Sequence, residues 1–141
     1  QIFAVSLTHS PLSTEQQTSI VEACSRDLLT SYGLRSLSPK SQRYAGIYDG
    51  DAYERDSIYH QGPVWGWLIG PFVEAYARVY NDDAKALAFL QPLLTHLGAG
   101  NCIGSMNEIF DGDAPHKPRG AIAQAWTVAE VLRVWRKLPK S

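Results

Sequence analysis

The chain has 141 residues, 45% of them hydrophobic and 11% aromatic, which is enough apolar material for one globular domain with a real core. The 13 lysines and arginines are balanced by 14 aspartates and glutamates, and this formal net charge of -1 leaves no excess of positive charge for the phosphates of nucleic acid. The longest apolar stretch, residues 64–73, is interrupted by glycine and proline and is far shorter than the ~20 residues that cross a bilayer, so no membrane span is predicted.

The cysteines and the first residues bear on the location and the completeness of the polypeptide. Cys24 and Cys102 lie far apart and form no CxxC motif, so neither a disulfide framework nor a zinc knuckle is predicted, and a cytoplasmic location is favoured. The chain begins Gln1-Ile-Phe-Ala-Val-Ser-Leu7, without an initiator methionine or the segments of a signal peptide. We therefore interpret the chain as a piece of a longer polypeptide.

The first half of the chain predicts one helix followed by a long loop. The helix covers residues 14–31, because Thr14 opens a Thr-x-x-Gln capping box and Gly33 is the expected C-cap. Its apolar positions recur every four residues at Ile20, Cys24 and Leu28. Residues 34–62 show no helical period but carry four tyrosines, which favours a functional loop over a disordered one.

Three more helices are predicted in the second half. The first covers residues 63–80, is apolar almost all round and must be buried, with a kink at Pro71. The second begins at Asp82 or Asp83, bends at Pro92 and is stopped by Gly98. The last covers residues 121–138 and points its apolar face inward through Ala125, Val128, Val131, Leu132 and Trp135.

About four helices of very different burial, joined by long polar and aromatic loops, predict an all-α fold. In such a fold an inner helix is covered by outer ones, as in a layered helical toroid. Short strands are expected at most at residues 2–6 and 106–110, and nothing favours a sheet-based fold. We expect residues 1–141 to form a single domain.

An acidic cluster lies on a loop before the last helix. Glu108, Asp111 and Asp113 surround Gly112, and glycine lets a ligand approach the backbone closely. Crowded carboxylates are groups that general acid and base chemistry uses. The alternative is a solvated turn beside a surface glutamate. A calcium loop is disfavoured because the twelve-residue ligand pattern is absent, and the four histidines have no metal-binding spacing, so neither a metal nor a cofactor is predicted.

Aromatic and amide side chains gather at the starts of two predicted helices. Tyr59, His60 and Trp65 precede or open the buried helix, and Gln124 and Trp126 open the last one. Sugars are bound by aromatic faces together with planar polar groups, because a pyranose has apolar CH patches ringed by hydroxyls. Each residue taken singly is also explained as an ordinary core or structural side chain. Taken together they favour a polyol pocket.

With these motifs, the chain resembles the C-terminal part of the glycogen debranching enzymes in their bacterial amylo-alpha-1,6-glucosidase form. The resemblance runs nearly end to end, and its acidic loop followed by a Gln-Ala-Trp helix is shared in outline with other toroid glycosidases such as glucoamylases. Four blocks carry it: Gln1-Ile-Phe-Ala-Val-Ser-Leu with His9-Ser-Pro-Leu12, Tyr32-Gly-Leu-Arg-Ser-Leu37, Tyr59-His-Gln-Gly-Pro-Val-Trp-Gly-Trp67, and Glu108-Ile-Phe-Asp-Gly-Asp113 with Pro118-Arg-Gly120 and Ala123-Gln-Ala-Trp-Thr-Val-Ala-Glu130.

The resemblance implies the C-terminal portion of an (α/α)6 toroid of six hairpins and inverting hydrolysis of α-1,6-linked glucose at a branch point of glycogen or limit dextrin. In that scheme Glu108 matches the general base, and the family's general acid lies upstream of residue 1. The implied substrate contacts are Tyr59, His60, Trp65, Asp111, Gln124 and Trp126. An inverting site needs both carboxyls, about 6.5–9.5 Å apart, so the chain alone is expected to be inactive.

Two other interpretations stay open at this point. In the first, the chain is a non-catalytic carbohydrate-binding or interaction module of the same fold. In the second, it is a scaffold whose helices bury a partner. In every case about four helices cannot close a toroid, so the remaining upstream part or self-association is expected to cover the open faces.

Overall fold

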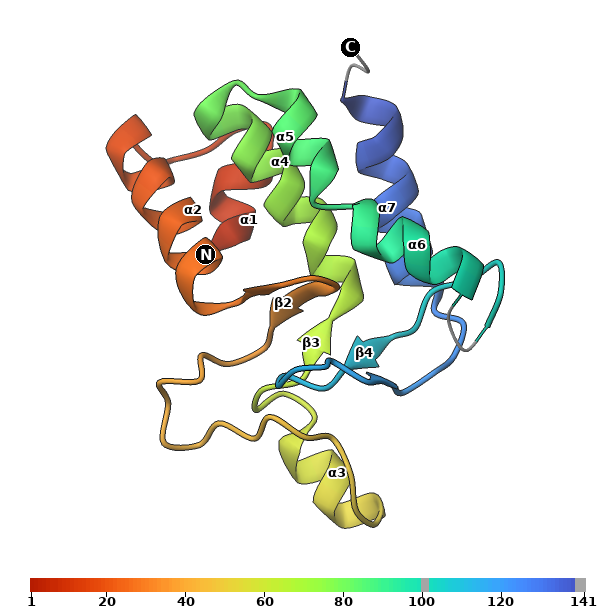
Figure 1. Ribbon diagram of the computed structural model, residues 1–141. Coiled ribbons are helices and arrows are strands. Elements are labelled where there is room, and N and C mark those ends of the chain that lie inside the picture. Colours follow the sequence, from red (N-terminus) through yellow and green to blue (C-terminus); the bar gives the residue numbers. More distant parts are fainter. Residues whose placement is uncertain (100–101, 139–141) are drawn as a thin grey trace.

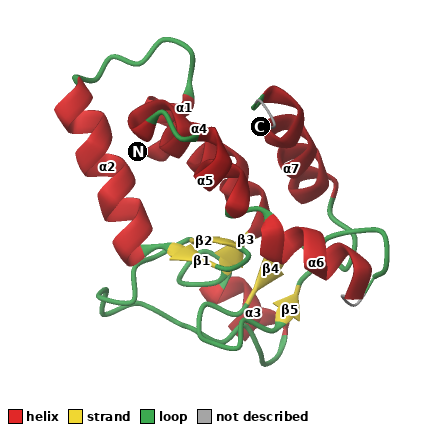
Figure 2. Ribbon diagram, turned by 45° about the horizontal axis from the view of Figure 1, so that its top comes forward, coloured by secondary structure: helices red, strands yellow, loops and turns green. Residues whose placement is uncertain are grey.

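The computed structural model describes residues 1–99 and 102–138. Within these residues the chain forms seven α-helices, one short 3-10 helix and a five-stranded antiparallel sheet (Figure 1). The prediction of an all-α fold with about four helices is therefore only partly confirmed. Most of the core lies among the helices, and the sheet lies below them and adds Leu34, Val64 and Phe110 to it (Figure 2).

One long buried helix organises the helical part. This helix, α4 (Ile69–Tyr80), packs against α1 (Ile2–Ser6) on one side and α7 (Ala125–Lys137) on the other. The helices α2 (Thr14–Asp27) and α5 (Asp83–Ala88) also pack on it (Figure 1). The core of the domain therefore follows the helix whose sequence is apolar all round, as predicted.

The helix α4 begins later than the sequence pattern indicated. Val64–Trp65 pair with other strands as β3, and Gly66–Leu68 form the 3-10 helix η1 before α4 starts at Ile69. Pro71 consequently lies in the first turn of α4, where a backbone N–H has no partner within the helix. Pro71 therefore removes no hydrogen bond from α4, and the kink predicted at this residue has no cause.

The next predicted helix is two helices. The first is α5, and its N-cap is Asp82, whose Oδ1 accepts the Lys85 N–H at 2.9 Å. The second is α6 (Gln91–Ala99), and Pro92 is its second residue, so the chain breaks ahead of the proline instead of bending at it. Gly98 lies inside α6 and does not terminate it.

The first predicted helix is shorter than expected. Its N-cap is Ser13, one residue before the expected Thr14, and Gln16 completes the capping box. The helix α2 ends at Asp27, and a hairpin of β1 (Leu29–Thr30) and β2 (Gly33–Arg35) follows. Gly33 has φ +149°, and a Cβ there would lie 2.3 Å from the Trp65 carbonyl oxygen. Gly33 thus permits strand pairing and is not a helix cap.

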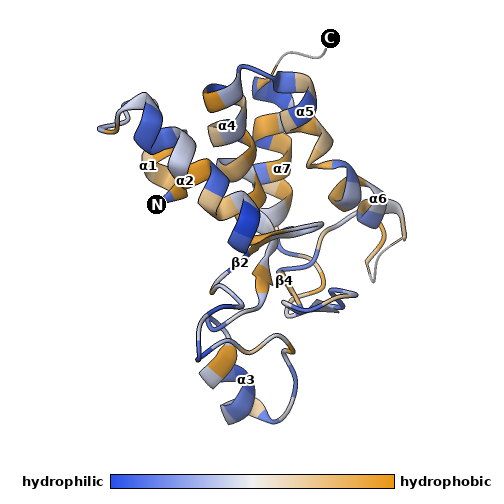
Figure 3. Cartoon of the chain, turned by 60° about the vertical axis from the view of Figure 1, so that its left-hand side comes forward, coloured by the Kyte–Doolittle hydropathy of each residue, from blue (hydrophilic) through white to orange (hydrophobic). Residues whose placement is uncertain are grey.

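Two short helices contradict the predicted pattern. Residues 2–6 form the helix α1 and not a strand, and its buried side chains Ile2 and Val5 are one turn apart. The helix α3 (Ala52–Ile58) lies inside the predicted loop and has no buried residue, so no apolar period could reveal it. Asp51 and Glu54 form its capping box, and α3 projects as a largely hydrophilic arm from the domain (Figures 1 and 3).

The sheet has the order β1-β2-β3-β4-β5, and every neighbouring pair is antiparallel. Its last two strands are β4 (Ile109–Phe110), which confirms part of the strand expected at 106–110, and β5 (Pro118–Arg119). Trp65 pairs with Ile109, and the Gly66 N–H donates to the Glu108 carbonyl at 3.2 Å. The sheet thus brings the start of the buried helix beside the acidic loop.

The last helix differs from its prediction on its exposed side. The helix α7 begins at Ala125, after the Gln124 N-cap, and buries Val131 and Val134. Ala125 and Leu132 are exposed, although the pattern pointed them inward.

Across residues 1–99 and 102–138, no helix has the length and apolar character to span a membrane.

Candidate active site

A cavity of about 700 Å³ lies where the sheet meets the starts of η1 and α7. It brings together every predicted site residue except Asp111, and it adds three that were not singled out as site residues. Its lining consists of Ser36, Tyr59, His60, Trp65, Trp67, Leu68, Glu108, Gln124 and Trp126.

One wall of the cavity is a packed group of three rings. The His60 and Trp65 rings are stacked, with centroids 5.1 Å apart and planes 9° from parallel. The Tyr59 ring lies 4.7 Å from that of Trp65, and the Trp65 Nε1–H donates to the Tyr59 carbonyl at 3.3 Å. The buried Trp65 thereby anchors two side chains that come from the end of the exposed helix α3.

Two tryptophans form a second aromatic group in the lining of the cavity. Trp67 and Trp126 meet edge to face with ring centroids 6.0 Å apart. The Gln124 Oε1 caps α7 by accepting the Trp126 N–H at 2.6 Å and the Thr127 N–H at 3.2 Å, which fixes Trp126 in the first turn. Trp126 is largely exposed. An indole with both a free face and a fixed position suits a sugar ring.

The Glu108 carboxylate is held by one donor on each oxygen. Its Oε1 accepts the Tyr59 hydroxyl at 2.5 Å, and its Oε2 accepts the Ala121 N–H at 3.0 Å. Across residues 1–99 and 102–138, no lysine or arginine forms an ion pair with Glu108. Neutral donors fix the orientation of a carboxylate without cancelling its charge.

The turn beside Glu108 requires a glycine. Gly120 has φ +62°, and a Cβ at this position would lie 2.5 Å from the Glu108 Oε2. The Glu108 N–H donates to the Ala121 carbonyl at 2.9 Å, so the same turn also holds the Glu108 backbone. The left-handed backbone at Gly120 thus creates the space in which the carboxylate lies.

The hydroxyl of Tyr59 stays protonated at ordinary pH. Burial, and then the hydrogen bond to the Glu108 carboxylate, raise the pKa of Tyr59 well above its usual value of 10. Tyr59 is therefore a permanent hydrogen-bond donor to Glu108.

Asp111 and Asp113 do not line the cavity. Asp111 is 2% exposed, and its carboxylate binds the Arg119 guanidinium and the Tyr48 N–H. Asp113 accepts the Tyr44 hydroxyl at 2.9 Å. The acidic cluster of the sequence is thus split, because Glu108 alone of these three carboxylates lines the cavity.

The residues that sequence reasoning missed had only weak signals. Trp67 closes the Trp-Gly-Trp motif and Ser36 lies in the Tyr32–Leu37 block of the resemblance, whereas Leu68 was only part of the helix predicted to be buried. In residues 1–99 and 102–138, no group of three His, Cys, Asp or Glu side chains is placed to hold a metal ion.

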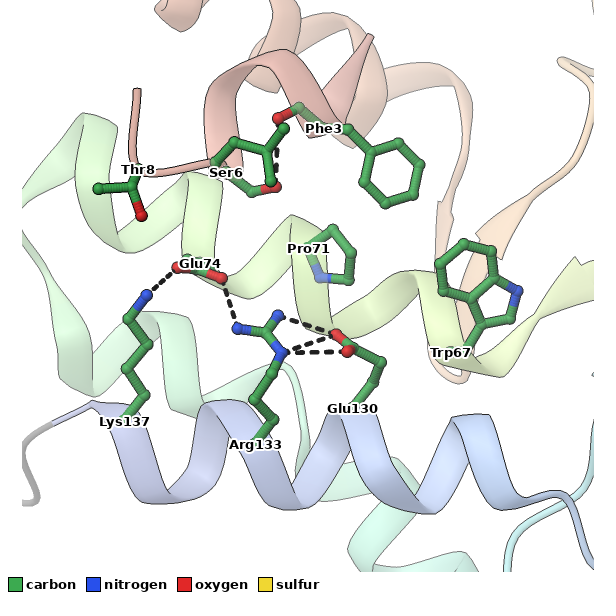
Figure 4. A pocket seen from close by; sticks show the side chains of 10 residues that line it. Phe3, Ser6, Thr8, Trp67, Pro71, Glu74, Glu130, Arg133 and Lys137 are labelled. Atoms are coloured by element: carbon green, nitrogen blue, oxygen red, sulfur yellow. Dashed lines mark hydrogen bonds and ion pairs between the residues drawn. The ribbon is translucent and has the colours of Figure 1, made fainter. Parts of the chain in front are cut away.

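A second cavity of about 330 Å³ lies between α1, α4 and α7 (Figure 4). Its charged side chains pair with one another: Arg133 bridges Glu74 at 2.7 Å and Glu130 at 2.8 Å, and Lys137 also binds Glu74. Trp67 lines both cavities. The charged side chains that line this second cavity are therefore paired with one another.

The arrangement around Glu108 can do one kind of chemistry. An oriented carboxylate beside aromatic faces can accept a proton from a water molecule next to a bound sugar. Glu108 is the one acidic side chain among the described residues that line the cavity, so a second carboxyl would have to come from elsewhere.

The family model described as amylo-alpha-1,6-glucosidase matches residues 1–133. The match includes every residue that lines the cavity and the part of α7 up to Arg133.

Proposed function

The chain belongs to the amylo-alpha-1,6-glucosidase family, the C-terminal region of glycogen debranching enzymes, and from this premise we propose that it supplies the general base of an inverting α-1,6-glucosidase. The observation that carries the proposal is the Glu108 carboxylate, oriented by Tyr59 and Ala121 at the edge of an aromatic cavity. The substrate is an α-glucan with a glucosyl branch, as in glycogen or limit dextrin.

In the proposed reaction Glu108 removes a proton from water. The water oxygen attacks the anomeric carbon of the branch glucose, and the bond from that carbon to the leaving oxygen breaks. The leaving oxygen takes its proton from a second carboxylic acid, which in this proposal lies outside the described residues. Attack from the side opposite the leaving group inverts the anomeric configuration.

The aromatic walls would hold the sugar for this step. His60 and Trp65 present one stacked platform, and Trp67 and Trp126 present the other. Ring faces bury the apolar CH patches of glucose, while polar groups such as Gln124 and Ser36 orient its hydroxyls. A sugar bound to these rings lies in the cavity that Glu108 also lines, beside the water that Glu108 activates.

The test replaces Glu108 in the full-length polypeptide. Glu108→Gln keeps the size and shape of the side chain but replaces one accepting oxygen with a donating NH2 group and removes the basicity, so glucose release from a branched limit dextrin should fall about 100- to 10,000-fold. Glu22→Gln, on an exposed position of α2, is the matched control and should release glucose at the parental rate. Parental release by Glu108→Gln would remove Glu108 from the base role.

A second candidate function is a carbohydrate-binding module without catalysis. It is favoured by the single acidic residue in the described lining, because an aromatic cavity binds sugar without a carboxylate pair. It predicts that maltooligosaccharide changes the tryptophan fluorescence of the full-length protein while limit dextrin releases no glucose. Glucose release that depends on Glu108 would exclude it.

A further inference from the structure

Asp111 is a buried carboxylate that does not reach the cavity. Its two oxygens accept the Nε–H and the Nη2–H of Arg119 at 3.1 and 3.2 Å, and Oδ1 also accepts the Tyr48 N–H at 2.8 Å. A buried charge is tolerated only when it is paired and hydrogen-bonded. The bidentate pair and the backbone donor meet this requirement together.

The carboxylate ties two segments that are distant in the sequence. Residues 46–49 belong to the loop before α3, and Arg119 belongs to β5. The Asp113 N–H adds a second link, because it donates to the Gly46 carbonyl at 3.0 Å. Asp49 also approaches Arg119, at 3.7 Å, but its side chain is 73% exposed and contributes little.

The loop held in this way supports the tyrosine that holds Glu108. The Tyr48 ring lies 5.7 Å from the Tyr59 ring, and the Tyr59 hydroxyl donates to the Glu108 carboxylate. Tyr59 follows α3, a helix without buried residues, so α3 itself provides no apolar support for that ring. Its position therefore depends on the rings around it, of which Tyr48 belongs to the clamped loop.

The geometry points to Asp111 and Arg119 as positioning residues for Glu108: their ion pair fixes the Tyr48 backbone, Tyr48 holds the Tyr59 ring, and Tyr59 orients the Glu108 carboxylate. The inference rests on the proposed function of Glu108. It also assigns Asp111 a role other than the sugar contact expected from the sequence, since its carboxylate is enclosed by protein donors.

The kinetic test uses three variants of the full-length polypeptide. Displacing a catalytic group by about 1 Å can cost about 100-fold in rate, so partial release of the loop should lower kcat by roughly 10-fold in Asp111→Asn, with KM within about twofold. Tyr48→Ala keeps the clamp but removes the ring and should give a similar loss. Asp49→Asn, which removes the exposed carboxylate near the same arginine, should leave kcat and KM unchanged.

Several kinetic outcomes would overturn the inference. Parental kcat in Tyr48→Ala contradicts it, even if Asp111→Asn does not fold. A double variant of Asp111→Asn and Tyr48→Ala that loses the product of the two single effects also contradicts it, because groups that act along one path are not additive. A rise in KM with parental kcat would assign Asp111 to sugar binding instead.

A spectroscopic readout separates this inference from the proposed function. The hydroxyl proton that Tyr59 donates to Glu108 should give a signal in the NMR spectrum, identified by its loss in Tyr59→Phe. Asp111→Asn and Tyr48→Ala should shift or broaden that signal, and Asp49→Asn should not. If Glu108→Gln released glucose normally, the proposed function would fail, and a signal unmoved in Tyr48→Ala would still overturn the positioning separately.

Discussion

The helical part and the site region of this molecule share one apolar core, to which the strands contribute Leu34, Val64 and Phe110, but the site region adds many directional contacts. In the helical part, fully buried apolar side chains interlock across helices, among them Val5, Val21, Phe72, Leu90 and Val134. In the site region, strands of two or three residues are joined by directional contacts: Arg35 Nε–H donates to the Gly112 carbonyl at 2.8 Å, and Ser36 accepts the Gly62 N–H at 3.0 Å.

The difference indicates how the orientation of single side chains is fixed in the site region. Hydrophobic contacts are strong in sum but non-directional, so they set the stability of the domain more than the angle of a single carboxylate. Hydrogen bonds and ion pairs contribute less to net stability but fix distances and orientations. We therefore expect core substitutions to unfold the molecule and site substitutions to change activity at nearly constant stability.

The largest expected effect tests the apolar packing of the helical part. Leu90→Ala removes a fully buried side chain and should lower the free energy of unfolding by about 2–5 kcal/mol, through lost burial and a new cavity. Leu132→Ala, on an exposed position of α7, should cost under about 0.5 kcal/mol. Chemical denaturation measures both, and equal losses would show that burial does not distinguish these positions.

The second-largest expected effect tests the hydrogen bond between Tyr59 and Glu108 in the site region. Tyr59→Phe keeps the ring but removes one donor to a charged acceptor, an interaction of about 1.5–3 kcal/mol, so kcat for glucose release should fall roughly 10- to 100-fold. The melting temperature should stay near that of the parent. Tyr53→Phe, which alters an exposed hydroxyl on α3, should leave both quantities unchanged. A Tyr59→Phe protein of parental activity would deny the tyrosine any part in orienting Glu108.

A third effect links backbone conformation to the carboxylate. Gly120→Ala introduces a Cβ near the Glu108 Oε2 at a left-handed position, which costs about 1–2 kcal/mol in backbone strain and displaces the carboxylate. Activity should fall several-fold. Gly98→Ala, inside α6 with open space around it, should keep activity and gain slight stability. Normal kinetics in Gly120→Ala would indicate that the turn relaxes freely.

The smallest effect concerns the ion pairs between α4 and α7. Burial tends to raise the pKa of Glu74, but its hydrogen bonds with Lys137 and Arg133 outweigh burial and hold the pKa below its ordinary value of 4.5. A lowered carboxyl pKa stabilises the fold above the unfolded value, and this stabilisation is lost as the pH falls below 4.5 through the folded pKa.

Stability should therefore decline more steeply below pH 4.5 in the parent than in Glu74→Gln. Arg133 and Lys137 are exposed, so solvent screening keeps the difference under about 1 kcal/mol. Unfolding measured by circular dichroism between pH 3 and 7 tests it, with Asp83→Asn on α5 as a surface control. Parallel pH profiles for the parent and Glu74→Gln would show that the α4–α7 ion pairs add nothing to stability.

The periodic and capped elements were determined by the sequence itself. The apolar rows of α4 and the capping signals near α2 and α5 identified three helices, because helical burial repeats with a fixed spacing along the chain. The motifs around Tyr59, Glu108 and Trp126 likewise identified residues that line one cavity. These inferences needed only neighbouring residues and their chemical types.

The tertiary structure alone decided what depends on partners far away in the chain. Val64–Trp65 are strand and not helix because β2 and β4 supply their hydrogen bonds, and no local pattern reveals those partners. Asp111 and Glu108 are three residues apart on one acidic loop, yet one pairs with Arg119 and the other faces the cavity. Sequence spacing brings carboxylates near each other, but the direction of each side chain is set by the groups that fold against it.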